Sequence, residues 1–125
     1  MSKYDFRIGN AVNYSMNGDL TLLQGTITSL GWNKAVINND SVKYANIQPI
    51  PLTEDLLYAC GCEEIEERMW LTPTVNHTRT RVRQTENGSF YSPINEHRVV
   101  ILPYLHTFQN YMQVMDGQEL EIKWT

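Results

Sequence analysis

The chain has 125 residues, 42% of them hydrophobic, and a formal net charge of −4. These values are typical of one compact unit or two small packed modules, and they argue against a disordered chain and a broadly basic nucleic-acid binder. No apolar run approaches the roughly 20 residues of a membrane span. The N-terminus, MSKYDFRIGN, lacks a hydrophobic signal core, so we expect a cytoplasmic protein without membrane contact.

Residues 6–50 predict four or five short strands separated by turn signals. Gly9 and Asn10 indicate a bend, Asn17-Gly18 is a strong hairpin signal, and a polar tip at 38–41 indicates a second hairpin. So many short strands in so few residues favour a small, strongly bent barrel. We therefore expect residues 1–52 to form an SH3-like β-barrel, with a two-sheet meander as the alternative.

Residues 53–62 predict a short helix that links the two halves. Thr53 is a good N-cap, and Gly61 can end the helix in the left-handed conformation. One apolar face is formed by Leu56, Leu57 and Cys60. A bridge between Cys60 and Cys62 would be strained, so we expect free thiols, as in a reducing compartment. The spacing is also wrong for a zinc knuckle, and we expect no metal and no cofactor.

Residues 63–125 predict an α+β unit. Three or four antiparallel strands follow one another between residues 63 and 102, with 64–72 as the first and an Asn87-Gly88 turn before the third. Pro103 opens a helix over 103–116, and residues 118–125 alternate as a final strand. We expect the helix to pack on the sheet through an apolar stripe formed by Tyr104, Leu105, Phe108, Tyr111, Met112 and Met115.

Three segments resemble a family of small uncharacterised proteins encoded by gut anaerobes, their phages and their mobile elements: RIGNAVNY (7–14), IPLTEDLL (50–57), which a Gly follows shortly, and YLHTFQNYMQVMDGQELEI (104–122). The family pattern runs from RIGN-x-V through PLTEEWL to H-x-L-Q-N-L-Y-x-A-L-T-G-E-E-L. The matching residues are Arg7, Ile8, Gly9, Asn10, Val12, Pro51, Leu52, Thr53, Glu54, His106, Gln109, Asn110, Tyr111, Gly117, Glu119 and Leu120. The departures are Cys62, Phe108, Met115, Asp116 and Gln118. The resemblance implies an accessory cytoplasmic protein of phage or mobile-element type and carries no assigned activity.

Four hydrogen-bonding side chains share the helix face opposite the apolar stripe: His106, Gln109, Asn110 and Gln113. They are candidates for a binding face. The alternatives, which we favour, are a solvated surface or side chains that tether a neighbouring loop.

A second candidate site is the segment HTRTRVRQ, which places a basic residue on every second position: His77, Arg79, Arg81 and Arg83. On a strand the arginines form a comb on one face, able to grip phosphates while Phe90 or Tyr91 stacks a base. The preceding segment contains Glu64 and Glu66, which have the same two-residue spacing as the arginines. Both belong to an acidic stretch, residues 53–68, which contains six acidic residues and one arginine. We favour pairing of the three arginines with these glutamates across a strand pair.

The sequence contains no phosphate loop, nucleophile elbow or zinc-protease motif, so we expect a protein that is not an enzyme and has no catalytic residues. The function we favour is a non-catalytic binding or adaptor protein that acts on a host or phage protein. One alternative is a nucleic-acid-binding accessory factor that uses the arginine strand. Another, an inhibitor of a host defence system, follows only from the genomic setting that the resemblance implies.

Overall fold

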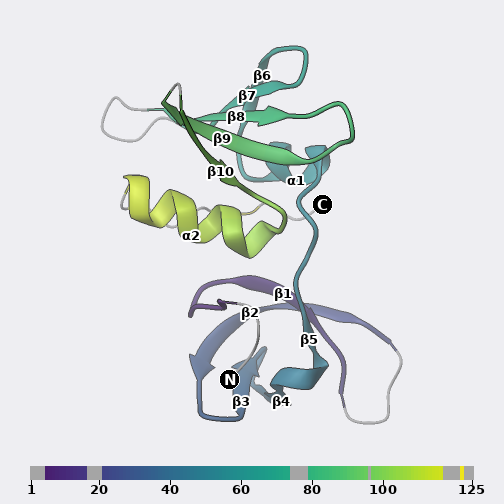
Figure 1. Ribbon diagram of the computed structural model, residues 1–125. Coiled ribbons are helices and arrows are strands. Elements are labelled where there is room, and N and C mark those ends of the chain that lie inside the picture. Colours follow the sequence, from purple (N-terminus) through teal and green to yellow (C-terminus); the bar gives the residue numbers. More distant parts are fainter. Residues whose placement is uncertain (1–4, 17–20, 74–78, 96, 117–121, 123–125) are drawn as a thin grey trace.

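The computed structural model describes residues 5–16, 21–73, 79–95, 97–116 and 122. Within them the chain forms two five-stranded antiparallel sheets with one long helix, α2 (Leu105–Asp116), lying between the sheets (Figure 1). This confirms the expected α+β class.

The N-terminal sheet has five strands, within the expected number, in the order β4-β3-β2-β1-β5. The long strand β2 pairs with β1 through its first half and with β3 through its second, so the sheet curls into a half-barrel. A single 3-10 turn over Tyr44–Asn46 precedes the last strand. The strands are β1 (Ala11–Tyr14), β2 (Leu23–Leu30), β3 (Lys34–Ile37), β4 (Asp40–Lys43) and β5 (Ile47–Gln48).

The predicted turns of this sheet are largely confirmed. Asn38 and Asn39 have φ of 52° and 68° and form the tip between β3 and β4, and Gly9 has φ of 97° in the bend before β1. Gly25 of β2 is required for a different reason, because a Cβ there would lie 2.5 Å from the Asn38 side chain. Asn17-Gly18 lies outside the described residues, although the strands on either side of it, β1 and β2, pair as a hairpin would require.

The short helix predicted after the barrel is α1 (Glu54–Ala59). The Thr53 hydroxyl accepts the Leu56 N–H as the predicted N-cap, and Gly61 follows the helix with φ of 85°. Leu57 and Cys60 are buried in the core beneath the C-terminal sheet. Helix α1 therefore packs against the second half of the chain.

The C-terminal sheet has the order β10-β9-β8-β7-β6. Its five strands exceed the three or four expected, because residues 63–71 are a hairpin and not one strand. The turn passes through Arg68, whose φ of 62° is rare for a residue with a side chain, so the sequence carries no turn signal there. The strands are β6 (Glu63–Glu66), β7 (Met69–Leu71), β8 (Arg81–Gln84), β9 (Phe90–Asn95) and β10 (Arg98–Ile101).

Helix α2 begins at Leu105, two residues later than predicted. Pro103 and Tyr104 instead join the two halves: the Leu52 N–H donates to Pro103 O at 3.2 Å, and Tyr104 forms a bridge with Pro51. Leu105, Phe108 and Met112 form the buried stripe, whereas Met115, predicted to belong to it, is exposed because it lies in the last turn, beyond the sheet's core. The predicted final strand, 118–125, lies almost entirely outside the described residues.

Two cores stabilise the protein and share strand β1. Val12 and Tyr14 point into the curl of the N-terminal sheet. Ala11, on the opposite face of the same strand, packs with Leu105 and Phe108 in the core of the C-terminal half. Strand β1 and helix α2 therefore form a second contact between the halves, beside that of Pro51 and Leu52 with Pro103 and Tyr104.

Candidate functional site

Arg81 and Arg83 lie on one face of the C-terminal sheet, opposite the core, as the two-residue spacing predicted; Arg81 is exposed and Arg83 is half-buried. They flank Val82, which is fully buried on the opposite face. The predicted partners are wrong, however, because β7 lies between β6 and β8. Glu64 pairs with Trp70 and Glu66 with Met69, so neither glutamate is opposite an arginine. The missed hairpin at Arg68 is the physical reason for the error.

Arg79 makes an ion pair of its own just before β8. Its Nη2 lies 3.3 Å from Glu63 Oε2, and its Nε donates to the Thr72 carbonyl at 2.6 Å. Arg79 is therefore held by Glu63 of β6 and by the backbone of Thr72, which directly follows β7. His77, at the start of the same pattern, lies outside the described residues.

One cross-strand row shows the character of this solvent face. Glu66 is opposite Met69, Met69 opposite Arg83, Arg83 opposite Tyr91, and Tyr91 opposite Ile101. Residues opposite one another in a sheet share a face. We call this surface the outer face; it comprises Glu63, Glu66, Met69, Leu71, Arg81, Arg83, Tyr91, Pro93, Val99 and Ile101.

The outer face changes in chemistry from one edge of the sheet to the other. Strand β6 is acidic, β8 is basic, and β10 presents Val99 and Ile101, which are 52% and 59% exposed. Val100, between them, packs against the core. Sequence reasoning placed these residues in an apolar strand but missed their exposure, because VVI carries no polar alternation. The exposure of these residues could have been predicted only from the strand order, in which β10 is at one end of the described sheet.

The polar face of α2 is turned inward, onto the segment that leads into β1. The Ala11 N–H donates to Gln109 Oε1 at 2.9 Å, and Gln109 Nε2 donates to Gly9 O at 3.3 Å. Asn110 accepts from Asn10 Nδ2 at 2.8 Å. Of the four predicted residues of this face, Gln109 and Asn110 therefore tether a neighbouring loop, whereas Gln113 is exposed one turn later.

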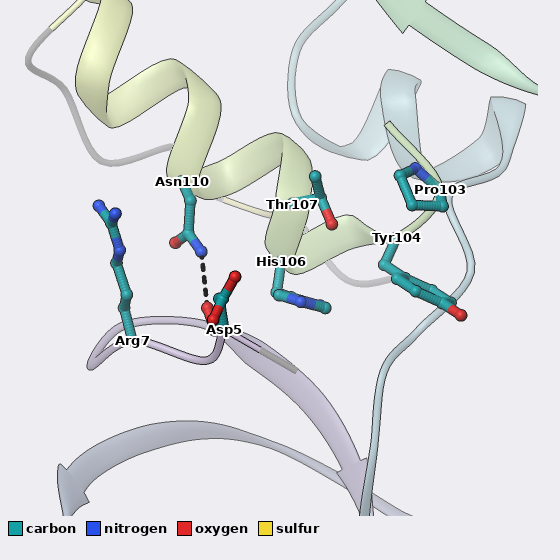
Figure 2. A pocket seen from close by; sticks show the side chains of 7 residues that line it. All are labelled: Asp5, Arg7, Pro103, Tyr104, His106, Thr107 and Asn110. Carbon is teal, nitrogen blue, oxygen red and sulfur yellow. Dashed lines mark hydrogen bonds between the residues drawn. The ribbon is translucent and has the colours of Figure 1, made fainter. Parts of the chain in front are cut away.

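A hollow of about 350 Å³ opens beside this tether. Figure 2 shows its walls: the Asn110 amide reaches the backbone oxygen of Asp5 at 3.1 Å, and the Arg7 side chain stands at the rim. Seven residues line it, two of them oppositely charged: Asp5, Arg7, Pro103, Tyr104, His106, Thr107 and Asn110.

His106 occupies the inner wall of the hollow. Its ring stacks on Tyr104 and meets the Phe6 ring edge-on at 4.7 Å between centroids. Burial lowers the pKa of His106 to about 4, and the nearby Asp5 carboxylate offsets this only in part. The imidazole is therefore neutral near pH 7 and acts as an aromatic packing group.

Cys60 and Cys62 are both buried free thiols. Burial raises the pKa of each to about 12, so the thiolate that a metal or an electrophile needs is scarce at neutral pH. In the part of the chain that the structure describes, no group of three or more His, Cys, Asp or Glu side chains could hold a metal ion.

Comparison with protein-family models, with curated proteins and with solved structures finds no match for this chain. Neither of the two described α-helices has the length and apolar character needed to cross a membrane.

Proposed function

We propose that this chain is a non-catalytic binding protein that acts on a host or phage protein through the outer face of its C-terminal sheet. The observation that carries the proposal is the pair Val99 and Ile101, more than half exposed on the same face as Arg81 and Arg83. Apolar side chains grouped at a surface indicate a contact that covers them, and arginine and tyrosine are enriched in such contacts. Tyr91 lies in the row between Arg83 and Ile101.

The proposed setting is the cytoplasm of a gut anaerobe, in a protein of phage or mobile-element type. It rests on the resemblance of the three short segments described above. Those segments meet in the structure: Asn10 Nδ2 donates to Asn110 Oδ1, Gln109 Nε2 donates to Gly9 O, and Pro51 forms a β-bridge with Tyr104. Segments that contact one another in the fold are expected to occur together in related chains. The contacts among the three segments therefore support the proposed relationship to the family of small phage and mobile-element proteins.

We also propose that the N-terminal sheet is an SH3-like barrel. Supporting features are the curl at β2, which serves two neighbours, and the 3-10 turn that leads into β5. This would make residues 1–52 a scaffold that supports α2 through β1. It adds no function by itself, because a fold of this kind hosts many activities.

Nucleic-acid binding through Arg81 and Arg83 is the second candidate. The aromatic Tyr91 beside Arg83 favours it, because a base could stack there. The acidic strand β6 on the same sheet and the net charge of −4 disfavour it. We therefore place protein binding first.

A pull-down from host lysate, with and without nuclease, tests the proposal. We expect a nuclease-resistant protein partner that is lost from the double variant Val99→Asp/Ile101→Asp. The matched control is Val114→Asp, which adds a charge at an exposed position of α2 far along the chain from the outer face. Nucleic acid in the eluate that depends on Arg81 would favour the second candidate, and a partner retained by the double variant would contradict the proposed surface.

A further inference from the structure

Trp32 is the most exposed large hydrophobic residue in the described part of the chain, at 83%. It lies in the turn between β2 and β3, which two hydrogen bonds hold in place. The Gly31 N–H donates to Lys34 O at 2.8 Å, and the Tyr44 hydroxyl donates to Gly31 O at 2.6 Å. An ordered turn therefore presents an indole ring that contributes almost no burial to folding.

Two positive charges lie beside this turn. Lys34 is directly opposite Lys43 in the β3–β4 pair, and both residues are exposed. Like charges in that arrangement destabilise a strand pair. Within the described residues, neither lysine forms an ion pair. Because Lys43 directly precedes Tyr44, the bond from Tyr44 to Gly31 holds this lysine pair close to the turn of Trp32.

The surface around the two lysines is free of acidic residues at the paired positions of the described strands. Asp40 of β4 is opposite the buried Ile37 and so belongs to the other side of the sheet. The acidic residues of the chain are concentrated in residues 53–68, outside this sheet. The local potential is therefore positive although the net charge is −4. We call this surface the lysine face; it comprises Ser29, Lys34, Val36, Ser41 and Lys43.

The lysine face differs from the outer face in the partner that its composition suits. Lysine and serine are depleted in protein–protein interfaces, where arginine, tyrosine and methionine are enriched. The outer face has the second composition and the lysine face has the first. An exposed tryptophan suits a protein or a nucleobase, so the lysines and serines decide between them. Strands β3 and β4 also lie on the side of the N-terminal sheet away from α2 and the C-terminal sheet (Figure 1).

We infer that Trp32 and the lysine face bind single-stranded nucleic acid. A base stacks on the Trp32 ring, and the neighbouring phosphates bind Lys34 and Lys43. Aromatic stacking serves any base, and lysine binds phosphate as a point charge. A duplex offers the same phosphates but keeps its bases stacked on one another, so the single strand is preferred. This inference goes beyond the proposed protein-binding function and does not depend on it.

The probe is a fluorescein-labelled oligothymidylate of about 12 nucleotides, titrated against the full chain by anisotropy. We expect saturable binding that is at least about fivefold weaker for an abasic strand of equal charge, because the base can no longer stack. Two phosphate contacts predict a slope of about −1.4 for the logarithm of the binding constant against that of the salt concentration. Absence of binding, or binding of the abasic strand or the duplex as tight as that of the single strand, would overturn the inference.

Changes in the protein separate stacking from charge. Trp32→Ala should weaken binding at least about fivefold and leave the salt slope unchanged, whereas Lys34→Gln or Lys43→Gln should each reduce the slope by about 0.7. The matched control is Tyr58→Ala, which removes another exposed aromatic ring, from α1, and should leave binding unchanged. Circular dichroism checks that each variant is folded. Binding of Trp32→Ala as tight as that of the parent protein would overturn the inference.

Two further outcomes separate the lysine face from the outer face. If Arg81→Gln abolishes binding of the oligonucleotide and Trp32→Ala does not, the nucleic acid occupies the outer face and the inference is overturned. If a nuclease-resistant protein from host lysate is lost from the Trp32→Ala variant, a protein occupies the lysine face, which also overturns it. We expect Val99→Asp/Ile101→Asp, which tests the proposed function, to bind the oligonucleotide as the parent protein does.

Discussion

The Gln109 side chain binds the backbone of Ala11: the Ala11 N–H donates to Gln109 Oε1 at 2.9 Å, although the two residues are 98 positions apart in the sequence. Both residues are buried. The same amide donates to Gly9 O, so one side chain of α2 satisfies two backbone groups at the entry to β1. This contact joins helix α2 to the entry of β1 and so to the N-terminal sheet.

Gln109→Leu is expected to lower the free energy of unfolding by about 1–3 kcal/mol, because it leaves the buried Ala11 N–H without its acceptor. Urea denaturation followed by circular dichroism measures this. Gln113→Leu is the matched control, since Gln113 is exposed one turn later on the same helix. Equal stability of the two variants would show that the Gln109 contact does not hold the halves together.

Arg79 and Arg81 are expected to differ although they are two residues apart. Arg79→Gln should cost about 1 kcal/mol, because the side chain loses its partly exposed contacts with Glu63 and the Thr72 carbonyl. Arg81→Gln should change stability by less than about 0.5 kcal/mol, since Leu71 is opposite it. A larger loss for Arg81 than for Arg79, measured by urea denaturation, would contradict the observed strand order.

Protonation of His106 is expected to destabilise the protein in mild acid. Its pKa is about 4 in the folded protein, below the ordinary value of 6.5, so the unfolded chain binds the proton more readily between these two values. The free energy of unfolding should therefore fall as the pH drops from about 6.5 to 4, with a slope of at most about 1.4 kcal/mol per pH unit from this group.

The control for this pH dependence removes the titrating ring itself. His106→Gln should flatten the slope between pH 6.5 and 4. If this variant retains the slope of the parent protein, other groups cause it and burial of His106 does not.

The two thiols are expected to be unreactive in the native protein. With pKa values of about 12 and buried side chains, Cys60 and Cys62 should react with an aromatic disulfide reagent at pH 7.5 at least a hundredfold more slowly than in urea. Stopped-flow absorbance measures both rates. Rapid modification of either cysteine under native conditions would show that the core around α1 opens readily.

Local signals in the sequence were sufficient for many elements. The Thr53 cap located α1, and the asparagines at the tip between β3 and β4 located that hairpin, because each residue type has a backbone preference of its own. The turn at Arg68 could not be predicted in this way, since arginine has no preference for the left-handed region. Because the turn at Arg68 was not predicted, Glu64 and Glu66 were expected on the strand next to the arginines. In the structure β7 lies between them, so the predicted partners of the arginines were wrong.

The candidate surfaces depended on contacts that are distant in sequence. The pattern of α2 identified Gln109 and Asn110 as one polar face, but their acceptors and donors are backbone and side-chain groups near residue 10. The exposure of Val99 and Ile101 depends on β10 being an edge, which is a property of the strand order and not of the VVI segment. Neither feature has a local signature.

Photo-cross-linking from the outer face tests the central claim most directly. A photoreactive amino acid at position 101, with one at position 114 of α2 as the control, would be activated in host lysate and the products analysed by mass spectrometry. The account predicts one discrete protein adduct from position 101 that is absent from position 114 and unaffected by nuclease. Equal labelling from both positions, or no adduct from position 101, would contradict it.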